Sequence, residues 1–169
     1  MSAANWPACI AFTLGEEGGL VDAPGDPGGL TNFGISQAAY PALDIGGLTR
    51  AGAEAIYRGD YWGAVRGDEL ASGVDLMVFD MAVNAGVARS AEILQRSLGV
   101  AADGVIGEAV TIPAARAADA GRLVAALGAA QLAFYESLSG WNEFGRGWGG
   151  RVGRRLARAK VMAATTTEA

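Results

Sequence analysis

The chain has 169 residues, 51% of them apolar, which is enough for one globular domain with a hydrophobic core. It has no histidine and one cysteine, Cys9, so Ser-His-Asp triads, Cys-His dyads and nearly all zinc sites made by protein ligands are excluded. Any catalysis must therefore use carboxylates, hydroxyls or the backbone, and we expect no cofactor and no metal. The net charge is −5, with −10 in residues 1–145 and +5 in residues 146–169. The acidic body argues against nucleic acid as a partner.

Residues 6–17 form the first predicted helix, which ends in two carboxylates. Its inward stripe comprises Trp6, Ile10, Thr13 and Leu14. Glu17 falls in the middle of this stripe, whereas Glu16 lies a full step away from it. Burial and the negative end of the helix dipole both favour the protonated form of a carboxyl in this place, and such a group can act as a general acid. The alternative interpretation is that Glu17 is only a solvated residue at the end of an amphipathic helix.

A loop rich in glycine, proline and aspartate follows the helix and extends to about residue 36. It includes the runs Glu17-Gly18-Gly19, Asp26-Pro27-Gly28-Gly29 and Gly34-Ile35-Ser36. These runs closely resemble the signature of glycoside hydrolase family 108, which contains bacterial and phage N-acetylmuramidases and proteins once called secretion activators. The resemblance implies that Glu17 is the catalytic residue. Leu20 departs from the family, which usually has an aromatic residue after the two glycines, and this departure concerns a sugar-stacking contact and not the acid.

The spacing in this loop is also similar to that of the family 24 phage lysozymes. In those proteins a helix-borne Glu is followed nine residues later by an Asp and then by a Thr, and Glu17, Asp26 and Thr31 fit with a one-residue difference. The similarity implies that Asp26, assisted by Thr31, stabilises the transition state or orients water. Asp22 is the alternative second carboxylate. A separation of about 6.5–9.5 Å between the two carboxyls predicts inversion, and one of about 5–5.5 Å predicts retention.

Residues 36–70 are predicted to form a helix, a turn and a second helix. The first helix covers 36–40, and Thr49 begins the second. Tyr61 and Trp62 in the second helix could pack in the core or stack on sugar rings. The stretch 56–62 again resembles family 108, which implies that at least one of these rings lines the substrate cleft.

The segment that begins at Asp75 has a helical period and places Asp80 and Asn84 on one face among apolar neighbours. Buried polar groups need partners, so these two side chains are either a satisfied structural pair or groups that face a cleft. Residues 79–86 resemble the corresponding family helix. We therefore expect Asn84 to contact substrate and Asp80 to be structural.

Residues 94–107 resemble the Leu-Gln, Leu-Gly and Asp-Gly pattern of peptidoglycan-binding modules, with Asp103 and Gly104 forming a tight turn. We predict a mainly α-helical, lysozyme-like single domain with its active-site loop after the first helix. Residues 1–92 form the catalytic half, 93–164 form the peptidoglycan-binding-like half packed as one continuous unit with it, and 165–169 form a frayed tail.

The last quarter of the chain is predicted to contain a long apolar helix over 119–139 and an irregular aromatic turn over 141–148. Four arginines then repeat at helical spacing and form one basic stripe, namely Arg151, Arg154, Arg155 and Arg158. The stripe is either a solvated face or a surface that attracts the protein to anionic cell-wall or membrane surfaces.

These observations lead to one functional prediction and two alternatives. We expect a monomeric enzyme whose partner is the glycan strand of peptidoglycan and which cleaves the β-1,4 bond between N-acetylmuramic acid and N-acetylglucosamine. Glu17 is the predicted general acid, with Asp26 and Thr31 as catalytic partners and with Asp22, Tyr61, Trp62 and Asn84 as substrate-binding residues. The alternatives are a lytic transglycosylase and a non-catalytic peptidoglycan-binding or secretion factor.

The sequence contains no pattern of a secretory signal, and its longest uncharged apolar stretch, 123–135, is shorter than a membrane span. We therefore expect synthesis in the cytoplasm and action on the cell wall in the periplasm after release through a holin. This arrangement suits an endolysin of a phage, a prophage or a gene-transfer particle.

Overall fold

The computed structural model describes residues 2–21 and 29–167, and it confirms the expected mainly α-helical fold. Short helical segments and a small hairpin join the longer helices. In chain order the elements are η1 (Ser2–Asn5), α1 (Trp6–Glu17), β1 (Thr31–Asn32), β2 (Ile35–Ser36), α2 (Arg50–Ile56), the π-helix η2 (Tyr57–Gly63), the 3-10 helix η3 (Gly67–Glu69), α3 (Val74–Ala85), α4 (Val87–Ser97), α5 (Thr111–Ala117), α6 (Ala120–Glu136) and α7 (Trp141–Thr167). None of the helices in the described residues combines the length and apolar character needed to cross a bilayer.

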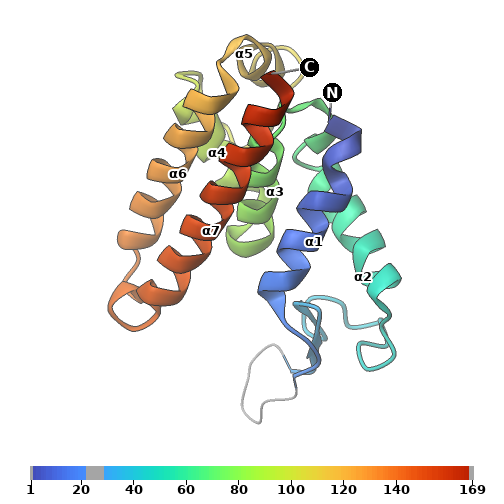
Figure 1. The fold of residues 1–169 in the computed structure, drawn as a ribbon. Coiled ribbons are helices and arrows are strands. Elements are labelled where there is room, and N and C mark those ends of the chain that lie inside the picture. The colour runs from blue at the N-terminus through green and yellow to red at the C-terminus, as the bar shows by residue number, and fades with distance from the viewer. Residues whose placement is uncertain (1, 22–28, 168–169) are drawn as a thin grey trace.

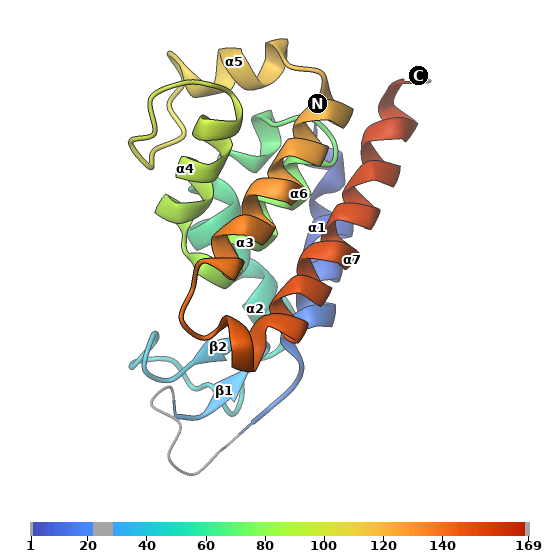
Figure 2. The same cartoon turned by 90° about the vertical axis from the view of Figure 1, so that its left-hand side faces the viewer.

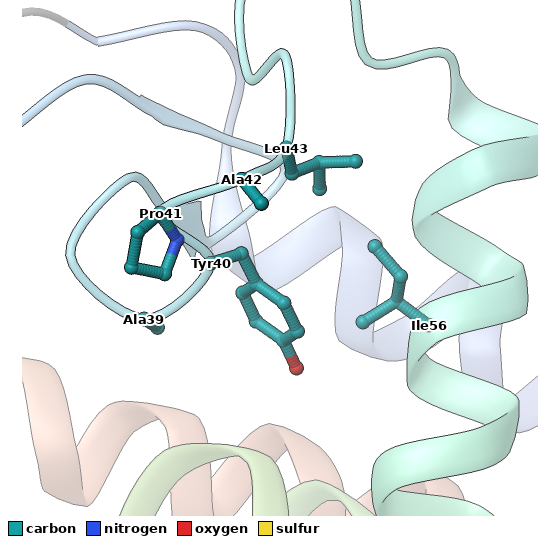
Figure 3. Close-up of a pocket in the computed structure, with 6 residues that line it drawn as sticks. All are labelled: Ala39, Tyr40, Pro41, Ala42, Leu43 and Ile56. Atoms are coloured by element: carbon teal, nitrogen blue, oxygen red, sulfur yellow. The ribbon is translucent and has the colours of Figure 1, made fainter.

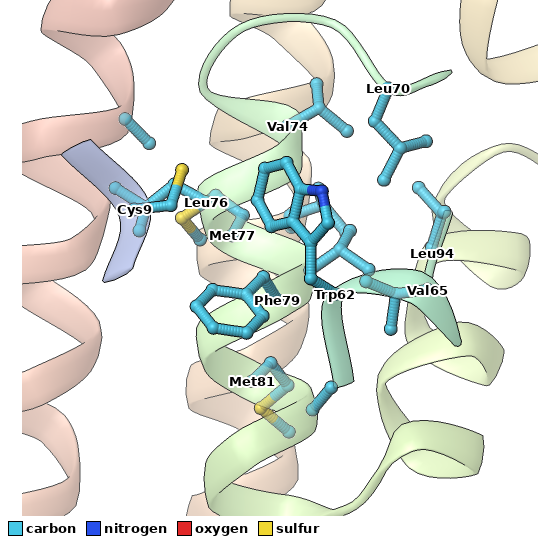
Figure 4. Packing of buried hydrophobic residues seen from close by; sticks show 14 of the residues in the cluster. Cys9, Trp62, Val65, Leu70, Val74, Leu76, Met77, Phe79, Met81 and Leu94 are labelled. Atoms are coloured by element: carbon cyan, nitrogen blue, oxygen red, sulfur yellow. The ribbon is translucent and has the colours of Figure 1, made fainter. Parts of the chain in front are cut away.

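Helix α3 forms the centre of the core. Its first nine residues, Val74 to Ala82, are all buried. Phe79 of this helix forms a cluster with two tryptophans, with its ring centroid 5.5 Å from that of Trp6 and 5.4 Å from that of Trp62. Figure 4 shows Trp62 and Phe79 packed against Val74, Leu76 and Met77 on one side of α3. Because α3 is enclosed over most of its length, it provides a rigid base for side chains that project from its exposed end.

The predicted stripe of α1 faces this core. Ile10, Thr13 and Leu14 are buried, and Trp6 packs edge-on against the core tryptophan. Cys9 is fully buried, and this burial raises the pKa of its thiol, with the charges of Asp75 and Asp80 adding to the effect. The helix ends at Glu17, as the sequence predicts.

Helix α7 lies beside α1 and runs in the opposite direction, and it also packs along α6 (Figures 1 and 2). The predicted irregular turn over 141–148 is wrong, because α7 already begins at Trp141. Trp148 stacks on Tyr135 of α6 and on Phe144, with centroids 5.6 Å apart in each case. This packing outweighs the low helix propensity of the glycines in the segment. The helix also continues to Thr167, past the expected start of the frayed tail.

The predicted helix over 36–40 does not form, because Ser36 ends the second strand of a hairpin and residues 37–39 make a turn. Thr31–Asn32 pairs in antiparallel fashion with Ile35–Ser36. Ser36 Oγ accepts a hydrogen bond from the Ala39 N–H, as a helix cap would, but the chain makes only a turn here. Thr49 caps α2 as predicted, because its side chain accepts the Gly52 N–H.

The Asp103-Gly104 turn after α4 has the predicted geometry. Asp103 Oδ1 accepts the Val105 N–H, and Gly104 has a φ of +78°. Gln95 holds the turn, since its Nε2 donates to Asp103 and to the Val105 carbonyl, while its Oε1 accepts the Gly104 N–H. A buried glutamine on α4 therefore fixes the loop that precedes α5.

Candidate active site

Glu17 is the last residue of α1, and its side chain is 18% exposed. Gly18 follows with a φ of +78°, so the chain turns away directly after the carboxylate. The hairpin of β1 and β2 lies beneath this end of α1 (Figure 2). The carboxylate is thus half-buried between the end of a helix and a tight turn.

The hairpin turn is formed by Phe33 and Gly34, which have φ values of +53° and +79°. Two successive positive φ values are typical of the type I′ turn of two-residue hairpins. A Cβ atom at position 34 would lie 2.6 Å from Glu17 Oε2 and 2.7 Å from the Tyr57 hydroxyl. Only glycine therefore fits against the carboxylate at this position.

The hydroxyl of Tyr57 holds the turn in place. It donates a hydrogen bond of 2.7 Å to the Phe33 carbonyl. Burial raises the pKa of Tyr57, and the negative charge of Glu17 raises it further. The phenol therefore remains a donor at neutral pH and stabilises the unusual backbone conformation of Phe33.

Arg151 of α7 contacts the other oxygen of the candidate acid. Its Nη2 lies 2.6 Å from Glu17 Oε1 and 2.7 Å from Asp80 Oδ1, and its Nε lies 3.0 Å from Asp80 Oδ2. One guanidinium thus binds Asp80 through two nitrogens and reaches Glu17 with one of them. Burial alone would lower the pKa of Arg151, but Asp80 and Glu17 outweigh it, so the net pKa is raised and the cation is retained.

Asp80 anchors this arrangement from α3. It is fully buried and also accepts hydrogen bonds from Arg155 Nη1 at 2.7 Å and Thr13 Oγ1 at 2.9 Å. Burial by itself would raise the pKa of this carboxyl, but the hydrogen bonds and positive charges of Arg151 and Arg155 outweigh it and lower the pKa. Asp80 is therefore an ionised structural residue, in agreement with the sequence prediction for it.

The predicted basic stripe needs correction. Arg155 is 0% exposed and Arg151 is 9% exposed, because both turn inward to the carboxylate of Asp80. Only Arg154 and Arg158 are exposed. Helical spacing predicted that the arginines would lie near one another, but a buried counter-ion on another helix decides which of them face solvent.

Glu16 and Arg154 form a second ion pair between the same two helices. Arg154 Nη2 lies 2.6 Å from Glu16 Oε2 and Nε lies 2.8 Å from Oε1. The hydrogen bond from Arg154 lowers the pKa of Glu16. The Glu16 side chain is 14% exposed but that of Arg154 is 59% exposed, so this pair lies at the rim with its arginine in solvent.

An aromatic wall continues from Tyr57 along η2. Tyr61, which is half-buried, has its ring centroid 5.6 Å from that of Tyr57. Next to it, the Tyr40 hydroxyl donates to Asp60 Oδ2 at 2.6 Å. The π-helical winding of η2 is a feature that often occurs at functional sites.

A largely apolar pocket of about 460 Å³ opens beside Tyr40. Figure 3 shows the Tyr40 ring in the space between the loop and Ile56 of α2. The residues that line the pocket are Ala39, Tyr40, Pro41, Ala42, Leu43 and Ile56. The candidate acid, the tyrosines and this pocket thus form a connected series of neighbours.

The expectation that Trp62 binds substrate is not met. Its side chain is 1% exposed, it packs against Phe79, and its Nε1 donates to Asp68 at 2.9 Å. The winding of η2 turns Trp62 to the core side of the helix while Tyr61 stays at the surface. Resemblance predicted that an aromatic residue would line the cleft, but it could not distinguish two adjacent rings.

Of the remaining predicted site residues, the structure describes Thr31 and Asn84. Thr31 lies in β1, pairs with Val21, and donates its hydroxyl to the Gly29 carbonyl at 3.2 Å. Asn84 is exposed near the end of α3, one turn beyond Asp80, and its Oδ1 accepts a hydrogen bond from the Tyr135 hydroxyl. Asp22 and Asp26 lie outside the described residues.

The arrangement is suited to proton transfer by a single supported carboxyl. Within residues 2–21 and 29–167, no group of three or more His, Cys, Asp or Glu side chains is placed to hold a metal ion. Glu17 has one oxygen bound by Arg151 and the other facing Gly34. A half-buried carboxyl with one oxygen held and one oriented can act as a general acid on a bound substrate.

Sequence reasoning missed three contributors to this site, namely Arg151, Gly34 and Tyr57. The signal for Arg151 was present, because a buried Asp80 requires a cationic or donor partner and a run of arginines occurs later in the chain. The signal for Gly34 was its place in the family-like run Gly34-Ile35-Ser36, to which no role was given. No sequence signal distinguished Tyr57 from the neighbouring aromatic residues.

Comparisons with known proteins identify the family of the chain. One family model, described as Glycosyl hydrolase 108, matches residues 10–86, and a second, described as Predicted Peptidoglycan domain, matches residues 89–155. The chain is similar to the solved structure of SagA from Brucella abortus, with 38% sequence identity, a TM-score of 0.86, and coverage of 96% of this chain and 97% of that chain. A comparison with curated proteins finds no match. The protein therefore belongs to the glycosyl hydrolase 108 family and is a glycoside hydrolase that acts on peptidoglycan.

Proposed function

We propose that the protein is an N-acetylmuramidase that hydrolyses the β-1,4 bond between N-acetylmuramic acid and N-acetylglucosamine, with Glu17 as the general acid. The observation that supports this most is the position of Glu17, which lies half-buried at the end of α1 between Gly34 and Arg151. A glycosidase needs a carboxyl that gives a proton to the leaving glycosidic oxygen. Glu17 combines partial burial with a fixed orientation.

In this proposal the reaction is a hydrolysis, and the proton that Glu17 gives to the leaving oxygen is replaced after the bond is broken. Glu17 protonates the glycosidic oxygen as the bond to the anomeric carbon of N-acetylmuramic acid breaks. Water adds to that carbon and gives a reducing end, and the second carboxylate takes the proton of the water or stabilises the positive charge of the transition state. Glu17 is reprotonated from solvent before the next turnover.

Asp26 remains the proposed second carboxylate, with Thr31 assisting it and Asp22 as the alternative. The support comes from the flanks of the loop that carries both aspartates. Val21 and Thr31 are joined by two backbone hydrogen bonds of 2.8 and 2.9 Å, four residues after Glu17. Both ends of the loop are therefore anchored close to the acid. We expect Asp26→Asn to lose much more activity than Asp22→Asn, and the reverse order would reassign the second carboxylate to Asp22.

Substrate binding is proposed for the aromatic wall and for Asn84. Tyr61 and Tyr40 present partly exposed rings beside the acid, and carbohydrate rings stack on such faces. Asn84 is exposed at the end of α3 and can offer its amide N–H groups to a sugar, because its carbonyl oxygen is occupied by Tyr135. The glycan strand would then extend across the hairpin end of the molecule.

Analysis of the products of purified sacculi by mass spectrometry tests the proposed reaction. Hydrolysis at the proposed bond yields fragments with reducing N-acetylmuramic acid ends. Fragments with 1,6-anhydro ends would instead identify a lytic transglycosylase, and equal, small losses in the two aspartate variants would agree with that outcome. Intact sacculi after prolonged incubation with folded protein would favour a non-catalytic peptidoglycan binder.

A further inference from the structure

We propose that Arg151 is a positioning residue that fixes the catalytic proton of Glu17 on Oε2, and that the second half of the chain thereby completes the active site. This inference rests on the proposed function of Glu17. It follows from the donors and acceptors around the carboxyl, from the rigidity of the group that holds Arg151, and from the place of Arg151 in the chain.

Arg151 contacts one of the two carboxyl oxygens of Glu17. A guanidinium has only N–H donors and stays protonated in proteins. Arg151 Nη2 lies 2.6 Å from Glu17 Oε1, so that oxygen must accept a hydrogen bond. A proton on Oε1 would point at another donor and would break the contact. When Glu17 is protonated, the proton is therefore held by Oε2.

The other oxygen of Glu17, Oε2, has different neighbours. This is the oxygen that faces Gly34, where a Cβ atom would approach it to 2.6 Å. The nearby phenol of Tyr57 already donates its proton to the Phe33 carbonyl. Among the described residues, Oε2 accepts no hydrogen bond. The proton is thus held on the oxygen that Arg151 does not contact, which packs against Gly34.

The guanidinium of Arg151 is itself held rigidly. Two of its nitrogens bind the two oxygens of Asp80, which is fully buried on α3. Arg155 and Thr13 hold Asp80 from α7 and α1. The guanidinium therefore has one orientation, and its contact with Glu17 does not depend on the movement of an exposed side chain.

Glu17 and Arg151 come from different halves of the chain. Glu17 lies within the stretch matched by the Glycosyl hydrolase 108 model, whereas Arg151 lies within the stretch matched by the Predicted Peptidoglycan domain model. The ion pair connects residues that are 134 positions apart. The second half of the chain thus contributes a side chain to the catalytic centre in addition to any part it takes in binding.

The charged and titratable groups that surround Glu17 come from three elements. They are Arg151 on α7, Tyr57 on η2, and Asp80 on α3, which acts through Arg151. Of these, only Arg151 carries a positive charge, and the adjacent Glu16 is neutralised by Arg154. Arg151 is therefore the cation among the described residues that can orient the carboxyl of Glu17.

The test measures kcat and KM on soluble, uncross-linked peptidoglycan strands. Arg151→Gln should lower kcat by about 10- to 100-fold with little change in KM, because the acid loses its orientation while the binding surface is kept. The comparison is made at equal concentrations of folded protein, and circular dichroism checks the fold of each variant.

Two further variants separate orientation from folding. Arg151→Lys keeps the positive charge and a donor, so it should recover part of the kcat that Arg151→Gln loses. Arg96→Gln removes an exposed arginine that pairs with Glu92 within α4, and it should change neither kcat nor KM. A loss in folded Arg151→Gln that comes from KM alone would overturn the inference.

The outcomes also separate this inference from the proposed function. If folded Arg151→Gln has the kcat of the wild type while Glu17→Gln is inactive, Arg151 does not position the acid and the inference fails alone. If folded Glu17→Gln is fully active, the acid assignment fails and the inference fails with it.

Discussion

Two ion pairs join the same two helices, and they differ in what lies behind them. Glu16 with Arg154 and Glu17 with Arg151 both connect the end of α1 to α7 through contacts of 2.6 Å. Arg154 is 59% exposed, whereas Arg151 is bound from behind by the buried carboxylate of Asp80. The contacts are alike in length, and the difference lies in the rigidity of the partner.

This difference has two physical consequences. An exposed pair is screened by water and salt and contributes little to stability, because two long side chains must be ordered to form it. A buried pair with further hydrogen bonds is costly to break, since one charge is then left without a partner in a medium of low dielectric constant. The ion pair of Glu16 therefore contributes little to stability, whereas the ion pair of Glu17 is part of the buried group that holds the two helices together.

Removing the buried anchor should have the largest effect on stability. Asp80→Asn keeps the shape of the side chain but removes the negative charge that Arg151 and Arg155 share, and we expect a loss of about 3–5 kcal/mol in the free energy of unfolding. Urea denaturation measures this loss. The matched control, Glu16→Gln at the exposed pair, should lose about 1 kcal/mol or less. Equal losses in the two variants would remove the distinction between the pairs.

A change at the glycine beside the acid should separate activity from stability. Gly34→Ala places a Cβ 2.6 Å from Glu17 Oε2, so we expect a loss of activity of about tenfold or more. The control is Gly99→Ala, since Gly99 has a similar φ of +71° but no atom within 4 Å of the added Cβ. Both variants should lose about 1–3 kcal/mol of stability, and only Gly34→Ala should lose activity. Full activity of Gly34→Ala would contradict the close contact.

Acid should weaken the fold through Asp80. The folded-state pKa of Asp80 is lowered, so its contribution to stability is present above the pKa of the unfolded chain, which is about 3.9 for Asp, and is lost as the pH falls through the lower folded value. We therefore expect the free energy of unfolding of the wild type to fall steeply below about pH 4. Asp80→Asn should show a shallower fall over the same range. Parallel curves from urea denaturation between pH 6 and pH 2.5 would contradict this assignment.

The smallest effect is expected at the exposed arginines. We propose that Arg154 and Arg158 contribute to attraction by anionic cell-wall or membrane surfaces, now that Arg151 and Arg155 are known to be buried. Replacing both exposed arginines with glutamine should weaken binding to sacculi a few-fold at low salt, and the difference should vanish at high salt. Identical salt dependence of variant and wild type would leave these side chains as a solvated face.

Much of the fold could be predicted from local sequence signals. The helix periodicity, the Thr49 cap and the Asp103-Gly104 turn all depend on neighbouring residues, and each was predicted with its main features. The helix over 141–148 was not predicted, because its glycines disfavour a helix and the contacts that stabilise it include packing on α6, which is distant in the sequence pattern. The hairpin of β1 and β2 was missed for a related reason, since its strands have only two residues each.

The candidate site could be predicted only in part for the same physical reason. The position of Glu17 at the end of a helix face is a local property and could be derived from periodicity. Its partner Arg151 is 134 residues away, and no local pattern indicates which two of the four arginines turn inward. Trp62 and Tyr61 show the same limit, because the π-helical winding of η2 decides which ring is buried.

The most direct test of the account compares the two adjacent glutamates. Glu17→Gln and Glu16→Gln are nearly isosteric changes at neighbouring positions, and the release of reducing ends from purified sacculi is measured for both at equal concentrations of folded protein. The account predicts that Glu17→Gln loses at least about 10²- to 10⁴-fold of the rate, while Glu16→Gln stays within about threefold of the wild type. A folded Glu17→Gln protein that releases reducing ends at the wild-type rate would contradict the assignment of Glu17 as the general acid.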